Sequence, residues 1–156
     1  MGDALAVACM HAKGFTKEDF ARSHPGGALG RRLLTHVRDV MRTGDAVPCV
    51  KEDISVLDAV REITKKHIGM TAVVNADNVF TEGDLRRLIE KRGDIRAIPI
   101  AEVMTKTPRT IEADAMAAAA ARILEETLVN QLLVVDKAGH LVGALHLHDL
   151  MTAKVI

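Results

Sequence analysis

Apolar residues at helical spacing alternate along the chain with short apolar stretches typical of strands. After a short apolar stretch at residues 48–50, apolar positions at helical spacing predict a helix with this buried stripe: Val56, Val60, Ile63 and His67 or Ile68. Asp53 or Ser55 is suited to cap that helix. The β-branched run TAVVN (71–75) then predicts a strand, and VFTEGDLRRLI (79–89) predicts a strand that leads into another helix.

The same order of elements returns in the second half. A strand is predicted at residues 109–111, and Asp114 is expected to cap the alanine-rich helix after it, with Ile123 and Leu124 directed inward. DKAGH (136–140) is rich in turn-forming residues and lies between two apolar runs, so it predicts a β-hairpin. Each half therefore has the order strand, helix, strand, strand, helix.

Matching residues indicate that the two halves are one unit used twice. Val40-Met41 recurs as Val103-Met104, and Asp84-Leu85, where a helix is expected to begin, recurs as Asp149-Leu150. The predicted fold is α/β, with two such modules in a pseudo-twofold pair preceded by a short helical segment. In the first half, NADNVF (75–80) leaves little room for a hairpin and its second strand. Either the turn is truncated, or a few residues are missing from the sequence here; we favour the second, because a deletion would remove strand as well as turn.

Composition excludes several classes of partner. Lys plus Arg and Asp plus Glu each number 21 in 156 residues, so no net charge draws the chain to nucleic acid or to a membrane. With no Trp, no Tyr and three Phe, aromatic side chains for stacking on single-stranded bases are scarce. Cys9 and Cys49 are too few for a disulfide scaffold and lack metal-ligand spacing. Because the N-terminus has no basic region and no apolar run approaches the length of a membrane span, we expect a cytoplasmic protein.

The motifs VMR and VMT, VFTEGDL and ALHLHDL resemble those of tandem CBS domains, and the resemblance spans residues 37–156. It implies two regulatory modules, residues 37–98 and 99–156, which commonly bind nucleotides in the clefts between the halves. It also implies a homo-oligomer, since two such pairs commonly stack into a disc-like dimer. A purely structural pair with empty clefts, which only assists oligomerisation, is the alternative.

The N-terminal segment carries a second resemblance. GDALAVACMHAKGFTKEDFARSHPGGALGRRLL (2–34) and VRDVMRTGDAVP (37–48) are similar to the end of the sugar isomerase domain, and its continuation, in D-arabinose 5-phosphate isomerases. That family interconverts ribulose 5-phosphate and arabinose 5-phosphate, the first step towards the lipopolysaccharide sugar Kdo. The resemblance implies that residues 1–36 are the tail of an isomerase domain plus a linker, and that the parent enzyme is a tetramer.

His24 lies in SHPGGALGRR (23–32), which lacks the GxxxxGK[ST] pattern of a phosphate-binding P-loop and follows no strand. Its Pro and Gly residues suit a linker. The isomerase resemblance places His24 at the active site of the longer enzyme, where an imidazole that titrates near neutrality suits proton transfer through an enediol. The other groups of that site would lie upstream, so we expect this chain alone to be inactive.

Thr81 and Asp84 are the first candidate ligand-binding pair. They lie where a strand runs into a helix, so both side chains can face a ligand at the helix N-terminus, with Asp84 accepting hydrogen bonds from a ribose. The alternative is an ordinary helix cap that needs no ligand. The CBS resemblance favours binding, since members of that family use this Thr/Ser-x-x-Asp pattern for ribose.

His146, His148 and Asp149 occupy the matching position of the second half. His146 stands where the family has a hydroxyl, which puts nucleotide binding at this second site in doubt. An imidazole can still donate to a phosphate or carboxylate, and its charge would depend on pH near 6.5. Two histidines on one strand face could hold a metal with Asp149, but no fourth ligand is evident, so we expect no metal. An anionic ligand and plain packing remain open.

Further residues are expected to line the clefts. Thr105 and Arg42 precede the first strands of the two halves, and Thr71 and Gln131 begin the matched second strands. The helix residues Arg86 and Arg87 can reach a phosphate or form a solvated helix face. No cofactor is required; the expected ligand is AMP, ADP, ATP or, as the activated end product of the pathway, CMP-Kdo, whose carboxylate would suit His146.

Overall fold

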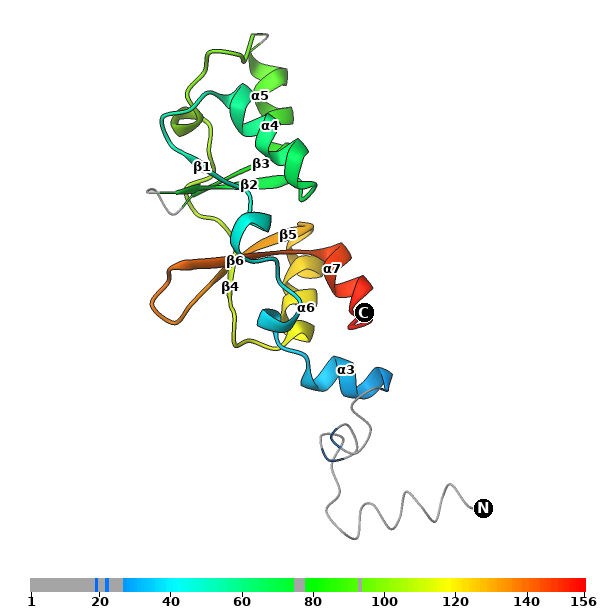
Figure 1. Ribbon diagram of the computed structural model, residues 1–156. Coiled ribbons are helices and arrows are strands. Elements are labelled where there is room, and N and C mark those ends of the chain that lie inside the picture. The colour runs from blue at the N-terminus through cyan, green and yellow to red at the C-terminus, as the bar shows by residue number, and fades with distance from the viewer. Residues whose placement is uncertain (1–18, 20–21, 23–26, 75–77, 93) are drawn as a thin grey trace, which may run out of the picture.

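The computed structural model describes residues 19, 22, 27–74, 78–92 and 94–156. After α3 (Ala28–Leu34), the chain forms two three-stranded sheets, each with two helices (Figure 1). The first module has these elements: β1 (Cys49–Lys51), α4 (Val56–Lys66), β2 (Met70–Val74), β3 (Asn78–Thr81) and α5 (Glu82–Lys91). The second has these: β4 (Thr110–Glu112), α6 (Ala117–Thr127), β5 (Gln131–Val135), β6 (Leu141–His146) and α7 (Leu147–Thr152). Three single 3-10 turns lie before β1 and β4: η1 (Val37–Asp39), η2 (Gly44–Ala46) and η3 (Ile100–Glu102).

The predicted α/β repeat is confirmed, because both sheets have the same topology. In each, the first strand is parallel to the second and the second is antiparallel to the third. Val50 pairs with Val73 in one sheet as Ile111 pairs with Val134 in the other. The parallel pairs are joined through α4 and α6, as parallel strands require a crossover.

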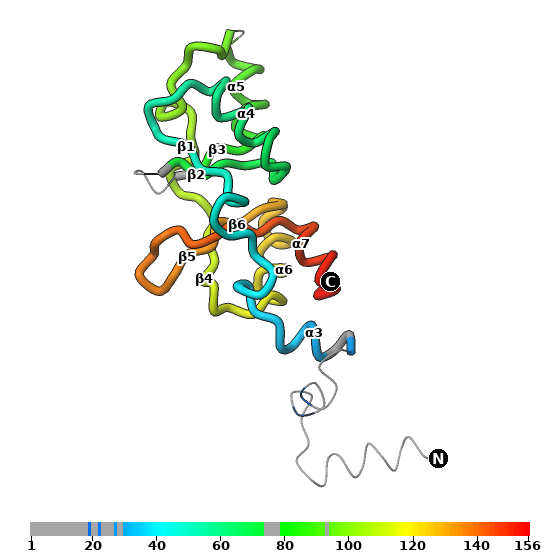
Figure 2. The backbone as a smooth tube through the Cα atoms, in the orientation of Figure 1, coloured from blue at the N-terminus to red at the C-terminus, as the bar shows by residue number. Residues whose placement is uncertain are grey.

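The two sheets face each other, and the helices cover their outer sides, so the layers run helix, sheet, sheet, helix (Figures 1 and 2). Alternation along each strand directs one set of side chains to the other sheet and the next set to the helices. The layer between the sheets contains these buried residues: Val47, Ile68, Met70, Ala72, Val79, Leu133 and Ala144. Each module also has a core under its own helices, with Phe80 in the first and Leu132 in the second.

The segment before β1 packs on the second module. We call residues 35–42 the first lead-in segment. The N–H of Val37 donates to the carbonyl of Ala115 at 2.9 Å, and Arg42 and Ala144 exchange backbone hydrogen bonds of 2.8 and 3.1 Å. Val37 is fully buried in the core of the second module.

The segment before β4 packs on the first module in the same way. We call residues 98–105 the second lead-in segment. The N–H of Ile100 donates to the carbonyl of Ile54 at 2.9 Å, and Thr105 and Val79 exchange backbone hydrogen bonds of 2.7 and 3.1 Å. The modules are therefore interlocked across the predicted boundary at residues 98 and 99.

Helix starts differ from several sequence expectations. Ser55 caps α4, as predicted, and accepts a hydrogen bond from the N–H of Asp58. Asp114 does not cap α6, because the helix begins later, after Met116. Asp84 and Asp149 do not begin helices either: each is the third residue of its helix and accepts a backbone hydrogen bond from the residue before the first turn.

The two hairpins have different outcomes. β5 and β6 pair as predicted around DKAGH, where Gly139 has a φ of 87°, a conformation that glycine adopts without strain. The expectation that residues 75–80 lack room for a second strand is wrong, because β3 forms and pairs with β2 from Asn78 onward. The turn itself, residues 75–77, lies outside the described residues. In the described part of the chain, no helix is long and apolar enough to cross a membrane.

Candidate functional site

Two cavities open between the modules, related by the internal repeat. The first, about 480 Å³, lies against the start of α5, and the second, about 410 Å³, lies between the end of α4 and the end of β6. Glu82, the first residue of α5, lines both. We call them the first and second clefts.

The first cleft has an apolar wall and a polar rim. Its apolar side chains come from both sheets and from the end of α6: Met70, Val79, Leu128, Val129 and Leu133. Its polar side comes from the start of α5 and the segment before β4, with these residues: Thr81, Glu82, Arg86, Arg87, Thr105, Thr107 and Arg109. An apolar wall beside hydroxyl and guanidinium groups suits a ligand that has both an apolar part and a negative charge.

Asp84 lies behind the rim of the first cleft and is 7% exposed. Its Oδ2 accepts hydrogen bonds from the Thr81 N–H at 2.9 Å and the Thr81 hydroxyl at 2.8 Å. Its Oδ1 accepts from the Thr105 hydroxyl at 3.0 Å and from the guanidinium of Arg87. The carboxylate therefore joins the α5 capping box to the second lead-in segment.

The cations of the first cleft differ in what they contact. Arg87 forms an ion pair with Asp84, although its own side chain is 62% exposed. Among the described residues, no carboxylate pairs with the guanidinium of Arg86 or Arg109, and both side chains are exposed. These two arginines lie near the N-terminus of the ten-residue helix α5, whose dipole also favours an anion.

Among the described residues, no arginine lines the second cleft. Its lining comes from the end of α4 and the loop after it, together with Glu82 and His146: Ile63, Thr64, His67, Ile68 and Gly69. Asp149, the counterpart of Asp84, is held by Arg42, whose Nε and Nη2 donate to the carboxylate at 3.1 Å each. Arg42 Nη1 also donates to the carbonyl of Lys66 at 3.1 Å.

His146 caps α7 as a neutral imidazole. Its Nδ1 accepts a 3.0 Å hydrogen bond from the N–H of His148, which requires an unprotonated Nδ1. Burial lowers the pKa of His146, and Arg42 and His148 lower it further, whereas Asp149 and Glu82 act in the opposite direction. The imidazole of His146 therefore caps α7 as the hydroxyl of Thr81 caps α5.

The structure brings together some of the sequence-predicted site residues and separates others. Thr81, Thr105 and Gln131 line the first cleft, and His146 lines the second. Asp84 and Asp149 are engaged behind these surfaces, the latter by Arg42. His148 is exposed and lies in α7, so the interpretation that it shares a strand face with His146 is wrong.

Thr71 does not reach either cleft. It is fully buried, and the neighbouring Met70 and Ala72 are the residues that face the other sheet. Alternation along β2 therefore directs Thr71 towards the helices of its own module. His24 lies outside the described residues. Among the residues that are described, no group of three or more His, Cys, Asp or Glu side chains could hold a metal ion.

The sequence alone does not assign the arginines that line the first cleft to a ligand site. The sequence predicts Arg109 as part of a strand, but it precedes β4, and its side chain lines the cleft. For Arg86 and Arg87 the sequence is compatible with a phosphate contact and with a solvated helix face. The signal available in the sequence was their position one turn after Asp84.

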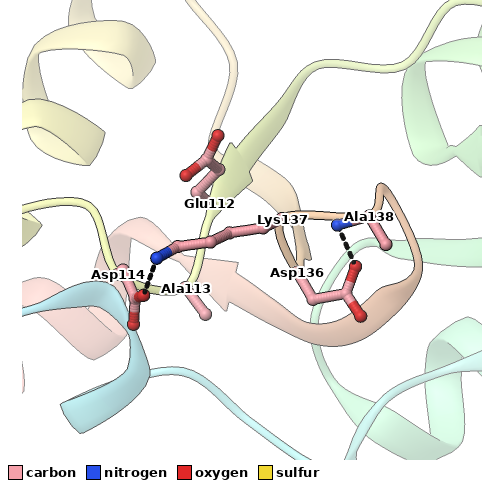
Figure 3. Close-up of a pocket in the computed structure, with 6 residues that line it drawn as sticks. All are labelled: Glu112, Ala113, Asp114, Asp136, Lys137 and Ala138. Carbon is pink, nitrogen blue, oxygen red and sulfur yellow. Dashed lines mark hydrogen bonds and ion pairs between the residues drawn. The ribbon is translucent and has the colours of Figure 1, made fainter.

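A third cavity, about 410 Å³, lies away from the two clefts (Figure 3). Its lining is Glu112, Ala113, Asp114, Asp136, Lys137 and Ala138. Lys137 forms an ion pair with Asp114 at 3.5 Å, and Asp136 accepts a 2.8 Å hydrogen bond from the N–H of Ala138 within the hairpin turn. Turn geometry and an exposed ion pair account for these contacts.

Comparison with known proteins agrees with both sequence resemblances. The CBS domain family matches residues 37–91 and 100–156. Arabinose 5-phosphate isomerase KdsD of Escherichia coli (strain K12) is 46% identical over 160 residues, covering 100% of this chain and 48% of that protein. The enzyme of the same name from Pseudomonas aeruginosa is 47% identical, covering 100% of this chain and 49% of that protein. The chain thus spans about half the length of the curated relatives it matches.

Solved structures share the fold. A conserved protein from Pyrococcus horikoshii superposes with a TM-score of 0.66 at 26% identity, over 76% of this chain and 91% of that chain. CBSX2 in complex with AMP superposes with a TM-score of 0.63 at 27% identity, over 76% of this chain and 95% of that chain. With both halves matched by the family and the paired-module fold in common with these structures, the chain belongs to the CBS domain family and carries two CBS domains in tandem.

Proposed function

We propose that this chain is the regulatory part of an arabinose 5-phosphate isomerase and that its CBS pair senses a nucleotide-containing metabolite in the first cleft. The observation that carries the proposal is the rim of that cleft, where Arg86 and Arg109 face a cavity without carboxylate partners among the described residues. Two guanidinium groups beside a helix N-terminus and threonine hydroxyls favour a phosphorylated ligand.

The ligand's parts match the parts of the cleft. The base packs on the apolar wall that includes Met70 and Leu133, and the phosphates lie near Arg86 and Arg109. The ribose hydroxyls bind Asp84 in place of Arg87, whose exposed side chain is free to swing towards the phosphates. The complex of CBSX2 with AMP supports an adenine nucleotide as the ligand class. CMP-Kdo is the competing candidate, because feedback on a first step would use the activated end product.

The longer protein supplies the catalytic part. We propose that residues 1–36 are the tail of the isomerase domain and the linker, that His24 belongs to the active site, and that the enzyme acts in the cytoplasm on the route to lipopolysaccharide. Ligand in the first cleft shifts the population of two arrangements of the CBS pair, and the linker carries that shift to the isomerase. The KdsD enzymes align with the whole of this chain at 46% and 47% identity, which supports the assignment.

A panel of AMP, ADP, ATP, CMP, CMP-Kdo and arabinose 5-phosphate, followed by thermal unfolding and calorimetry, tests the proposal. A ligand at 100 times its Kd adds about 2.7 kcal/mol to the free energy of unfolding, which raises Tm by several degrees. Arg109→Ala should abolish that rise, whereas Arg122→Ala, on the exposed side of α6, should keep it. Absence of any rise across the panel would overturn the sensing function.

An assembly role is the second candidate, and one surface favours it. Apolar side chains are exposed around the helices of the second module: Leu128 (92%), Met151 (55%) and Ile156 (54%). Leu128 and Ile156 line a groove of about 470 Å³ between α6 and α7. We propose that this surface pairs with a second copy of the chain in the enzyme. Light scattering of the chain without nucleotide tests assembly, and the nucleotide panel tests sensing; a stable dimer that responds to no nucleotide would favour the assembly role alone.

A further inference from the structure

The two clefts differ in charge although the repeat relates their backbones. Arg109, whose carbonyl accepts from the N–H of Leu133, corresponds to Pro48, whose carbonyl accepts from Ala72 in the same way. Arg86 and Arg87 follow Thr81 as Met151 and Thr152 follow His146. Each arginine of the first cleft therefore has an uncharged residue at the matching position of the repeat.

Arg42, behind the second cleft, is already engaged. Arg42 corresponds to Thr105, since each follows the matched Val-Met pair. Thr105 makes one 3.0 Å hydrogen bond to Asp84, but Arg42 clasps Asp149 through Nε and Nη2. The side chains of Arg42 and Asp149 are only 24% and 17% exposed, so water screens this pair less than a surface pair.

Arg42 also ties the first module to this contact. Its Nη1 donates to the carbonyl of Lys66 at the end of α4, and the ammonium of Lys66 in turn donates to the carbonyl of Asp45 in η2. One guanidinium thus joins the first lead-in segment, the last turn of α4 and the first turn of α7. A carboxylate that already accepts three donor contacts from Arg42 has little capacity left for a ribose.

From this geometry we propose that Arg42 is the built-in partner of Asp149 behind the second cleft. It takes the place of a ligand at Asp149, latches the two modules together through Lys66, and limits the pair to one nucleotide per chain. The limit on stoichiometry rests on the function proposed above; the latch does not. Because Arg42 ends the first lead-in segment, the latch also fixes that segment to both modules.

Hydrogen exchange tests the latch without any ligand. Arg42→Thr, which installs the residue found at position 105, should raise amide exchange about tenfold at residues 64–68 and 147–150, because the contacts that hold both turns are lost. Arg42→Lys keeps the charge without the fork and should give a smaller rise. Arg61→Ala removes an exposed ion pair from α4 and should leave both segments unchanged. Unchanged exchange in a folded Arg42→Thr chain would overturn the latch.

Calorimetry with AMP tests the limit on stoichiometry. We expect one AMP per wild-type chain; two per chain would overturn the assignment of Asp149 as already occupied by Arg42. Thr105→Arg should close the first cleft by the same means and weaken AMP binding at least tenfold, whereas Thr105→Val, which removes only the hydroxyl, should weaken it less. If wild type binds no nucleotide from the panel, the sensing function fails while hydrogen exchange still decides the latch.

Discussion

The hydroxyl of Thr105 donates a 3.0 Å hydrogen bond to the carboxylate of Asp84 and thereby connects the second lead-in segment to the first turn of α5. Thr105 belongs to the second half of the sequence and Asp84 to the first. The contact lies at the rim of the first cleft, so any group that binds Asp84 competes with a bond that holds the halves together. The ligand binding proposed at Asp84 would therefore be coupled to inter-module packing.

Asp84→Ala should weaken both nucleotide binding and folding. The substitution removes the N3 member of the α5 capping box and leaves the hydroxyls of Thr81 and Thr105 without their acceptor. We expect a loss of about 2 kcal/mol in the free energy of unfolding, from the cap and the unpaired hydroxyls together. Urea denaturation measures the first effect and calorimetry with AMP the second.

Asp84→Asn separates the two effects, since the amide keeps an acceptor oxygen but loses the charge. The stability loss should fall to about 1 kcal/mol, because charge-assisted bonds are stronger than neutral ones. Nucleotide binding should remain weak, because the amide offers one acceptor oxygen where the carboxylate offers two to the ribose hydroxyls. Full binding by Asp84→Asn would mean that the ribose lies elsewhere.

His146 should make stability depend on pH. Burial lowers the pKa of His146 in the folded chain below its unfolded value near 6.5. The unfolded chain then binds the proton more readily, so the stabilising contribution is complete above pH 6.5 and is lost as pH falls towards the folded pKa. Protonation would also remove the Nδ1 acceptor that caps α7. Urea denaturation at pH 7.5 and 5.5 measures the difference.

His146→Thr is the matched comparison, because threonine occupies this position in the first module and caps α5. The variant should be less sensitive to pH than wild type, and its stability relative to wild type should increase as pH falls below 6.5. Parallel pH profiles for the two chains would exclude His146 as the titrating group.

Much of the fold follows from local signals in the sequence, whereas the site depends on how the halves meet. Helix spacing from Val56 to Ile63 and the turn-forming DKAGH identify elements that short-range geometry determines. The sequence did not predict that each lead-in segment packs on the other module, because nothing near Val37 indicates that it is buried in the second module. The contact of Arg42 with Asp149 was not predictable for the same reason, because it forms only when the first lead-in segment packs on the second module.

Thr71 and Asp114 show two smaller reasons why sequence reasoning failed. Thr71 lies one residue from the cleft-lining Met70, and a single step along a strand reverses the face. Asp114 is a good cap by type, but its carboxylate instead pairs with Arg38 of the first lead-in segment and with Lys137. Tertiary contacts override the local preference in that case.

Interlocking predicts that neither half folds alone. Ile100, from the second half of the sequence, is fully buried in the core of the first module. Ile100→Ala should cost about 2–5 kcal/mol, as for other buried aliphatic residues, and hydrogen exchange should rise in α4 and α5. Ile89→Ala, at a position that is 53% exposed, should change stability by less than about 0.5 kcal/mol. A chain of residues 37–98 that unfolds cooperatively by itself would contradict the interlock.

Leu128 tests whether the exposed apolar surface has a role in assembly. It ends α6 in the left-handed region, with a φ of 53°, and is 92% exposed. A leucine in this conformation is strained, and asparagine adopts it more readily, so Leu128→Asn should stabilise an isolated chain by about 0.5–1 kcal/mol and raise Tm by about 1–4 °C. His67→Asn is the matched control, because His67 ends α4 with a φ of 55° and lies away from the α6 and α7 groove. If the surface pairs two copies, light scattering should show Leu128→Asn dissociating at concentrations where His67→Asn remains paired. Equal association of the two variants, with both Tm values raised, would assign Leu128 to the first cleft alone.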